Sequence, residues 1–305
     1  MRKRGALLGL IAALTASPVL GAPGLAQRLL GVDRATAWTP AGAIPVQFPT
    51  FHPQGMVRIG DEFFVSSVEV RRAPAPDPKQ KGGRDAGAGV GHLFKISADG
   101  ALLADLILGE GDAYHPGGID YDGRFIWVPV AEYRPDSRAV IYRVDPRTMT
   151  ATAVLRAADH IGAMVHDRAT GKLHGVSWGA RRFYDWTLSP NGKASAPRIF
   201  ANRSSYIDYQ DCHGLDGGQM LCSGLASYRS PTPGAAFQLG GWEIVGLVDH
   251  RPVWQAPIML WAPSGRAMTQ NPFFAEATAT GLRAWFMPDD NRSTIYVYDA
   301  AIPPH

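Results

Sequence analysis

Four histidines occupy comparable places in the sequence, and each is followed within three residues by a glycine: His52, His115, His160 and His213. Neutral imidazole suits Zn, Fe, Cu or Ni as a ligand, and it also serves as a general acid or base. We therefore expect the four side chains to form one catalytic or metal-binding centre, with Zn or Fe as the metal. The alternative is a set of structural histidines, each hydrogen-bonded within the fold.

Carboxylates, aromatic residues and arginines recur together some way after each of these histidines. Glu69 and Glu132 are expected to act as catalytic residues that orient a metal ligand or a bound water. Arginine donates two parallel hydrogen bonds to carboxylate or phosphate, which predicts an anionic substrate. The expected substrate-binding residues are Tyr133, Arg134, Trp178, Arg181, Tyr228, Asn271 and Asp289. The alternative is a set of exposed loop ion pairs that contribute little to stability.

A repeated unit carries these residues, and it is clearest between Tyr114 and Leu155. Short runs of aromatic and β-branched residues alternate there with turn residues, which predicts four antiparallel strands. Asp122-Gly123 marks one of the turns, since glycine accepts a positive φ without steric cost. A four-stranded meander of about 40 residues is typical of one β-propeller blade.

The unit recurs along the chain, with openings at Phe51, Tyr114, His160, Cys212 and Asn271. The fifth copy ends after its third strand, whereas residues 28–49 precede the first copy. A propeller is commonly closed by a strand from the other terminus, which removes an open sheet edge. We therefore predict an all-β, five-bladed β-propeller over residues 27–305, closed by an N-terminal strand within Ala35–Phe48.

The inner strands of a propeller surround its axis, so residues at their entries meet at one mouth of the ring. In this register the four histidines stand at the entries of four blades, and Asn271 stands at the fifth. The longer loops lie on the same face, and binding sites favour variable loops on a rigid scaffold. The sequence thus predicts an axial pocket for a small-molecule substrate or ligand. The histidines outside this pattern are interpreted as ordinary: His92, His166, His174, His250 and His305.

The two cysteines of the chain, Cys212 and Cys222, flank the turn signal Asp216-Gly217-Gly218. A hairpin about this turn would place the two side chains nearly opposite each other. In an exported protein this arrangement predicts a disulfide. Two buried free thiols are the alternative.

The N-terminus combines Arg2-Lys3-Arg4 with an apolar run from Ala6 to Ala16, the pattern of a cleavable export signal. We expect residues 1–26 to be removed and the mature protein to be periplasmic or secreted; a retained signal anchor is the alternative. Cleavage takes three positive charges from a formal net charge of +3 and leaves a neutral domain. Neutrality argues against nucleic-acid binding, which needs a basic surface. No later segment is apolar enough to span a bilayer, and we expect a monomer.

The segment HPGGIDYDGRFIWVPVAEYRP resembles a family of exported microbial β-propeller-like proteins that has no established activity. The resemblance extends over most of the mature chain. More distantly, the layout is similar to propeller lactonases, secreted glutaminyl cyclases and streptogramin lyases, whose catalytic motifs do not match here residue by residue. Two functions stay open, because fold alone does not determine function. One is a hydrolase or lyase acting on a small anionic or sugar-derived substrate. The other is a non-catalytic binding or scaffold protein that uses the same mouth.

Overall fold

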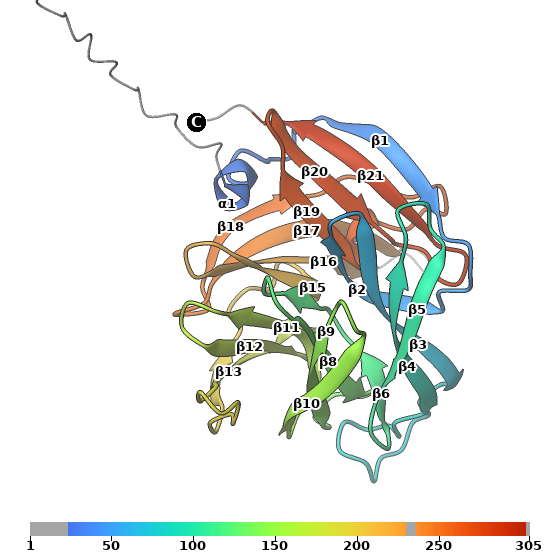
Figure 1. Ribbon diagram of the computed structural model, residues 1–305, viewed down its shortest axis with the longest axis vertical. Helices are drawn as coiled ribbons and strands as arrows, with labels where there is room; N and C mark the ends of the chain where they lie inside the picture. The colour runs from blue at the N-terminus through green and yellow to red at the C-terminus, as the bar shows by residue number, and fades with distance from the viewer. Residues whose placement is uncertain (1–23, 230–235, 303–305) are drawn as a thin grey trace, which may run out of the picture.

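Five antiparallel sheets are arranged in a ring, as Figure 1 shows for this computed structural model. The structure describes residues 24–229 and 236–302, so most of the predicted export signal lies outside it. The arrangement confirms the predicted five-bladed β-propeller. Among the described residues, no helix has the length and apolar character needed to cross a membrane.

Each blade is a meander whose strands follow one another in the sequence. Blade one contains β2 (His52–Ile59), β3 (Glu62–Arg72), β4 (Ala88–Ile96) and β5 (Leu102–Leu108). Blade two contains β6 (Ala113–Pro116), β7 (Asp120–Tyr121), β8 (Ile126–Glu132), β9 (Ala139–Asp145) and β10 (Thr150–Ala157). Blade three contains β11 (Ile161–Asp167), β12 (Lys172–Ser177), β13 (Arg182–Thr187) and β14 (Arg198–Ala201). Blade four contains β15 (Asp208–Leu215), β16 (Gln219–Arg229), β17 (Ala236–Gly246) and β18 (Pro252–Pro257).

The ring is closed in blade five by a strand from the N-terminal part of the chain. That blade contains β19 (Phe273–Ala277), β20 (Gly281–Phe286), β21 (Thr294–Ala301) and β1 (Trp38–Pro45). Strand β1 runs antiparallel to β21, with Trp38 opposite Ala300 and Pro45 opposite Thr294. The predicted closing strand is confirmed, and it covers what would be an open edge of blade five.

A short helix, α1 (Leu25–Leu29), is fixed to the ring rather than standing apart from it. Leu29 is fully buried in the same apolar cluster as Trp242 and Phe286. The guanidinium of Arg28 donates through Nη2 to the carbonyl of Ala279 at 3.0 Å. Two short 3-10 helices, η1 (Trp178–Ala180) and η2 (Met268–Gln270), lie in loops between strands.

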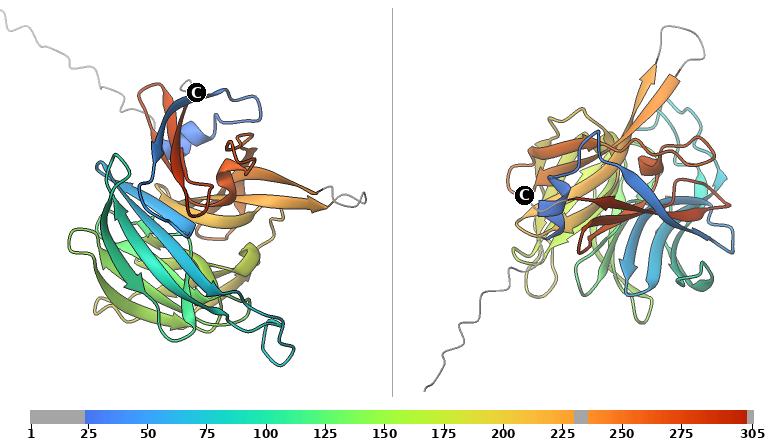
Figure 2. Two further views of the ribbon diagram at one scale, coloured as in Figure 1. Left: turned by 90° about the vertical axis from the view of Figure 1, so that its right-hand side faces the viewer. Right: turned by 90° about the horizontal axis from the view of Figure 1, so that it is seen from above.

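Strands β16 and β17 extend well beyond their neighbours and form a hairpin that projects from the ring (Figure 2). The register pairs Arg229 with Ala236 and Leu225 with Gly240. Tyr228 and Phe237 stack on each other on this hairpin with ring centroids 5.1 Å apart. Tyr228 is therefore not at the mouth where the sequence placed it.

The predicted disulfide is present between β15 and β16, where Cys212 and Cys222 are directly paired in the strand register. The hairpin turn at Asp216-Gly217-Gly218 produces this pairing, because it folds the two strands back symmetrically. The bond closes a short loop inside the buried interface between blades three and four.

Replacing both cysteines by serine is expected to lower the free energy of unfolding by about 2.7 kcal/mol, the chain-entropy value for so short a loop. Chemical denaturation of wild type and the double variant under non-reducing conditions measures the difference. Reduction should shift the wild-type midpoint towards that of the variant and leave the variant unchanged. Equal unfolding free energies for oxidised and reduced wild type would contradict the expectation.

Candidate functional site

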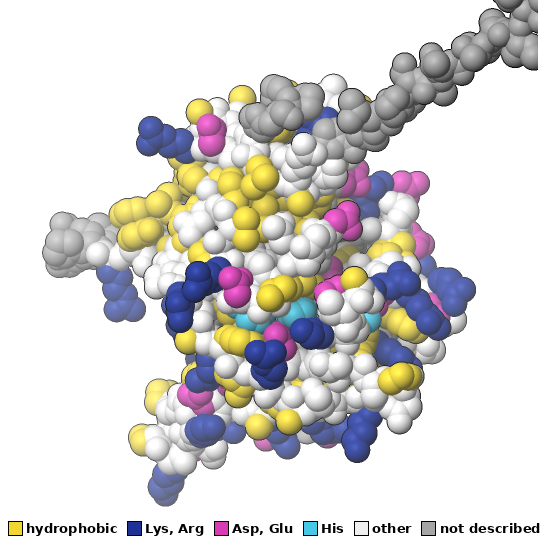
Figure 3. Space-filling model, turned by 90° about the vertical axis from the view of Figure 1, so that its left-hand side faces the viewer, with side chains coloured by type: hydrophobic (Ala, Val, Ile, Leu, Met, Phe, Trp, Pro, Cys, Tyr) yellow, Lys and Arg dark blue, Asp and Glu magenta, His cyan; other side chains and the backbone are white. Residues whose placement is uncertain are grey.

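A cavity of about 240 Å³ lies at one mouth of the propeller, on the axis of the ring. Histidine side chains are visible at the centre of the face shown in Figure 3, surrounded by basic and acidic side chains. Five residues expected from the sequence line the cavity: His52, Tyr133, His115, His160 and Trp178. Residues to which the sequence gave no site role also line it: Gln54, Gly162, Ser177, Gly179, Asp208, Tyr209 and Gln210.

The three histidines converge because each stands where the chain enters an inner strand. His52 begins β2, His115 lies within β6, and His160 directly precedes β11. The strands approach closely at the axis: a Cβ on Gly117 would lie 2.1 Å from the carbonyl oxygen of Gly162. Only glycine fits such an approach, which brings the imidazoles of neighbouring blades together.

His115 is the most isolated polar group of the cavity. Its side chain is buried, and neither ring nitrogen has a hydrogen-bond partner among the described residues. Its ring stacks on Tyr133 with centroids 4.1 Å apart. Burial, together with the imidazoles of His160 and His52, holds the pKa of His115 well below its usual value. His115 is therefore neutral, with one N–H donor and one lone pair available to a ligand.

His160 is fixed in one orientation by the blade next to it. Its Nδ1 lies 2.9 Å from the carbonyl oxygen of Glu132, and its ring meets Trp178 edge-on with centroids 4.8 Å apart. Burial lowers the pKa of His160 to about 4. Because a carbonyl only accepts, Nδ1 carries the proton of the neutral ring, and the lone pair is on Nε2.

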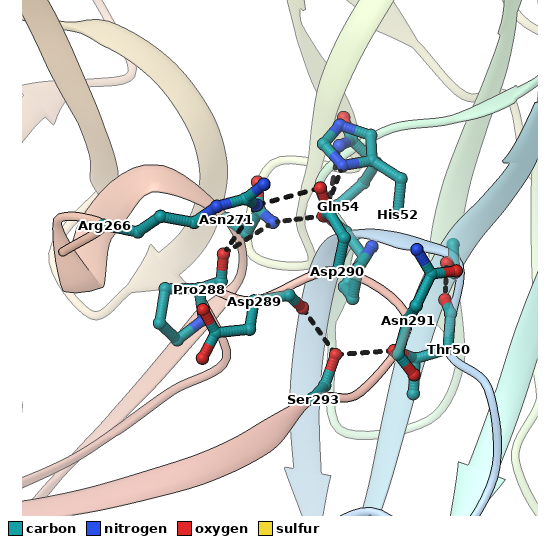
Figure 4. A network of polar contacts seen from close by, with 12 residues as sticks. Thr50, His52, Gln54, Arg266, Asn271, Pro288, Asp289, Asp290, Asn291 and Ser293 are labelled. Atoms are coloured by element: carbon teal, nitrogen blue, oxygen red, sulfur yellow. Dashed lines mark hydrogen bonds and ion pairs between the residues drawn. The ribbon is translucent and has the colours of Figure 1, made fainter. Parts of the chain in front are cut away.

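His52 forms a dyad with a carboxylate from blade five, as Figure 4 shows. Its Nδ1 lies 2.7 Å from Oδ1 of Asp290. Asp290 also accepts from Arg266 Nη1 at 2.8 Å and from the buried Asn271 Nδ2 at 3.3 Å. Burial opposes ionisation of Asp290, but the bonds from His52 and Arg266 outweigh it and lower its pKa. Asn271 thus reaches the mouth only indirectly, by positioning Asp290.

The other carboxylates and arginines expected at the site are already paired with each other. Glu132 is buried between Arg134 and Arg138, each 2.6 Å away, so its carboxylate is paired with two arginines and is not available to a ligand. Arg181 pairs with Asp208 at 2.7 Å, and Glu69 pairs with Arg71 at 2.9 Å. Asp289 turns away from the mouth and accepts from the hydroxyl of Ser264 at 2.5 Å. None of Glu69, Arg134, Arg181 and Asp289 lines the cavity.

The sequence interpretation missed Arg84, the cation that lies over the aromatic wall of the cavity. Its guanidinium carbon is 4.6 Å from the ring centre of Trp178 and 5.2 Å from that of Tyr133. Nε and Nη2 are buried and have no hydrogen-bond partner among the described residues. The residue comes from the Pro- and Gly-rich insertion between β3 and β4, where no periodic pattern indicates which side chain turns inwards.

His213 is not the fourth member of the ring, and its predicted position is wrong. The inner strand of blade four begins at Asp208, so His213 lies further along β15, inside the barrel of inner strands. The strand registers give the correspondence, because β2 and β15 carry the same bulge, between Pro53 and Gly55 and between Tyr209 and Asp211. Asp208, not His213, therefore corresponds to His52 in blade four.

His213 instead belongs to a buried polar cluster that joins the blades at the axis. Its Nε2 lies 2.9 Å from the carbonyl oxygen of Phe273 in blade five, and its ring nitrogens are 3.6 Å and 3.7 Å from carboxylate oxygens of Asp211 and Asp120. Asp211 accepts backbone N–H groups from Met56 at 3.0 Å and from Ile119 at 2.9 Å. The cluster thus links four of the five blades.

Among the described residues, one group brings three possible metal ligands within 4.8 Å of one another, and it is not the ring at the mouth. It consists of His174, Asp185 and His250, and it could hold a metal ion. At the mouth, the ring centroids of neighbouring histidines are 6.5 Å apart for His52 and His115, and 6.1 Å apart for His115 and His160. This spacing is wider than the 5.8 Å between the rings of His174 and His250, and the mouth histidines are not among the groups whose ligand atoms lie within 4.8 Å of one another in the described residues.

Residues 12–304 match the model of DUF6454, a family of unknown function. Three similar solved structures are all distant. The tail fibre of Staphylococcus aureus phage P68 has 9% identity and a TM-score of 0.49, over 88% of this chain and 53% of that one. The chain thus spans about half the length of the fibre protein. A luciferin-regenerating enzyme has 8% identity and a TM-score of 0.45, over 86% and 97% of the two chains. The hydrazine synthase of Kuenenia stuttgartiensis has 11% identity and a TM-score of 0.38, over 83% and 67%. No curated protein matches the chain.

Proposed function

The chain belongs to DUF6454, and we propose that it is an exported hydrolase or lyase that acts on a small anionic substrate in the mouth cavity by acid–base catalysis. The observation that carries this proposal is the His52–Asp290 dyad beside a neutral, unpartnered His115. A ring nitrogen backed by a carboxylate, next to a free N–H donor, supplies the two groups that such reactions need.

His52 is assigned the role of general base. Asp290 accepts the Nδ1 proton, so the lone pair of the neutral ring is on Nε2 and can take a proton from substrate or water. The same carboxylate stabilises the imidazolium that forms after this transfer. Arg266 and Asn271 hold Asp290 in place through their own hydrogen bonds, so the base is oriented before substrate binds.

His115 is assigned the stabilisation of developing negative charge. Its neutral ring carries one N–H, and burial makes a hydrogen bond from that group stronger than it would be in water. Before substrate binds, both of its nitrogens are unsatisfied, which costs about 1–3 kcal/mol for each buried polar group. A substrate oxygen that accepts the N–H would satisfy one of them, so binding and catalysis draw on the same contact.

Arg84 is assigned the role of binding the anionic group of the substrate. Arg134 and Arg181 are engaged by Glu132 and Asp208, whereas two nitrogens of Arg84 have no partner among the described residues. Its guanidinium lies over the rings of Trp178 and Tyr133, which line the cavity. An unpaired, preoriented guanidinium is well suited to bind a carboxylate or phosphate group.

The proposal is tested with a panel of small lactones, esters and uronic acid derivatives, each paired with a neutral analogue that lacks the anionic group. Turnover of at least one anionic member is expected, with little turnover of its neutral analogue. Arg84→Gln should raise KM for that substrate by about 10-fold or more, because a charge-assisted bond is worth about 1.5–3 kcal/mol. Arg143→Gln is the matched control, since its guanidinium also lies over an aromatic ring, that of Phe125 at 5.1 Å, outside the mouth.

Two outcomes would count against the proposal. Binding of the anionic compounds without turnover, weakened by Arg84→Gln, would identify a non-catalytic binding protein that uses the same mouth. Neither binding nor turnover across the panel would leave the cavity without the assigned role.

A further inference from the structure

We propose that His174, Asp185 and His250 bind a Zn²⁺ ion that fastens blade three to blade four. Two imidazoles and a carboxylate form a ligand set that zinc accepts, with water as the usual fourth ligand. The three side chains come from three segments: β12, β13 and the turn between β17 and β18. This site is separate from the mouth cavity, and none of its residues lines that cavity.

The three ligand atoms lie within 4.8 Å of one another, close enough to be brought onto one ion. Nδ1 of His174 lies 2.8 Å from Oδ1 of Asp185, and Nε2 of His250 lies 2.9 Å from the same oxygen. Two ligand atoms that each lie about 2.1 Å from a tetrahedral Zn²⁺ are about 3.4 Å apart, so the three atoms would separate by about 0.5 Å to receive the ion. His174 Nδ1 is hydrogen-bonded to Oδ1 of Asp185, whereas His250 Nε2 has no hydrogen bond among the described residues despite its short distance. The lone pair of His250 Nε2 is therefore available to an ion.

Without a cation the cluster is poorly satisfied. His174 Nε2 and both ring nitrogens of His250 are buried and have no hydrogen-bond partner among the described residues. The side chains of His174 and His250 are each 1% exposed, and that of Asp185 is 6% exposed. Within the described part of the chain, Asp185 pairs with these two histidines and with no lysine or arginine. A divalent ion would balance the negative charge of a buried carboxylate that has no lysine or arginine beside it.

The surrounding structure holds the three side chains in place. His174 and Asp185 are directly opposite each other in the register of β12 and β13. His250 has a φ of +54°, an uncommon conformation for a residue other than glycine, and its ring lies 4.7 Å from those of Phe183 and Phe200. The backbone of blade four therefore adopts a strained conformation that presents this imidazole to blade three. The three side chains are almost completely buried, so a substrate could not reach an ion bound to them. A buried site that joins two blades therefore has a structural role.

The test is metal analysis of the full chain purified without chelator, followed by titration of metal-stripped protein with ZnSO₄. About one Zn²⁺ per chain is expected in wild type, and His174→Gln and His250→Gln should lose it. At 100-fold excess over its dissociation constant, Zn²⁺ should raise the Tm of stripped wild type by about 5 °C and that of His250→Gln by much less. Co²⁺ in place of Zn²⁺ should give visible d–d absorption in wild type that is absent in His250→Gln.

His166→Gln is the matched control, because His166 also contacts a buried carboxylate, Asp122 at 2.6 Å, but without a second imidazole. It should keep full metal content, as should His52→Ala and His115→Ala. Stripped wild type whose Tm and calorimetric titration show no response to Zn²⁺ would overturn the proposal. A second result would also overturn the proposal: metal that is retained by His250→Gln but lost by His52→Ala and His115→Ala. That metal would be bound at the mouth.

Discussion

Replacement of His52 by alanine is expected to lower kcat by about 100- to 10,000-fold, the range that a positioned general base contributes. The residue is the one imidazole of the mouth whose partner is a carboxylate, Asp290 at 2.7 Å. Without it, neither His115 nor His160 can replace the function, because both rings are buried and have a lowered pKa. A weak base whose neutral form is favoured accepts a proton poorly at neutral pH.

The variant should remain folded, which separates catalysis from stability. The side chain of His52 is 33% exposed, so truncation leaves a cavity that water can fill. The comparison is kcat with the anionic substrate found in the panel, together with the Tm of each protein. His166→Ala is the control. It also removes an imidazole that contacts an aspartate, Asp122, but both residues line a different pocket from the mouth cavity. Undiminished kcat in His52→Ala would remove the assigned base.

Asp290→Asn provides a second measurement on the same dyad. The amide oxygen can still accept from His52 Nδ1, but it carries no charge to stabilise the imidazolium. We expect a smaller loss of kcat than in His52→Ala, with KM nearly unchanged, because Asp290 positions the base and does not touch the substrate. A loss confined to KM would instead indicate that the pair only shapes the cavity.

The fold was predictable because its signals are local and repeated. Five openings with alternating apolar residues and turn signals specify blades, and an incomplete last copy indicates closure by the N-terminal strand. The pairing of Cys212 with Cys222 followed from one hairpin turn between them. The strands of each blade and the cysteine hairpin depend on residues that are close in the sequence. The closing strand pairs the two ends of the chain, and it was predictable because the fifth copy is incomplete.

The site was predictable only in part, because its errors arise from non-local geometry. His52, His115 and His160 meet as expected, but the inner strand of blade four begins at Asp208, five residues before His213, and leaves His213 inside. The His-Gly pattern that aligns the copies does not mark where this strand begins. Arg84 and the pairing of His52 with Asp290 also escaped prediction, since Arg84 comes from an irregular loop and Asp290 from the opposite end of the chain.

Replacement of Asp211 by alanine is expected to lower the free energy of unfolding by about 3–5 kcal/mol, the range for breaking a buried charged pair. Asp211 is fully buried on the axis and accepts backbone N–H groups from blades one and two. Its removal leaves these donors unpaired and takes the nearest counter-charge from His213. Asp211→Asn keeps the shape and should lose less, because the amide oxygen satisfies one donor while its NH₂ group faces the other.

The axial cluster also predicts how stability depends on pH. Burial raises the pKa of Asp211 to about 7, against the opposing effect of His213 and the backbone donors. Burial alone would lower the pKa of His213, but Asp211 and Asp120 outweigh it and raise the value. The folded chain therefore binds more protons here than the unfolded chain does between about pH 4 and pH 7. The resulting stabilisation is complete below the unfolded pKa values and is lost as the pH rises through the folded ones.

Denaturant unfolding of wild type and Asp211→Asn between pH 4.5 and 8 measures this contribution as the difference between the two slopes, up to about 1.4 kcal/mol per pH unit for one proton. Burial lowers the pKa values of His115 and His160, which act with the opposite sign, and raises that of Glu243, so only this difference reports the axial cluster. This contribution to the slope should be lost in Asp211→Asn. It should persist in Tyr209→Phe, which removes a hydroxyl that donates to the buried Glu243 at 2.9 Å but leaves the axial carboxylates in place. Equal slopes in wild type and Asp211→Asn would show that the axial cluster does not couple folding to protonation, and that its carboxylates act through their backbone hydrogen bonds alone.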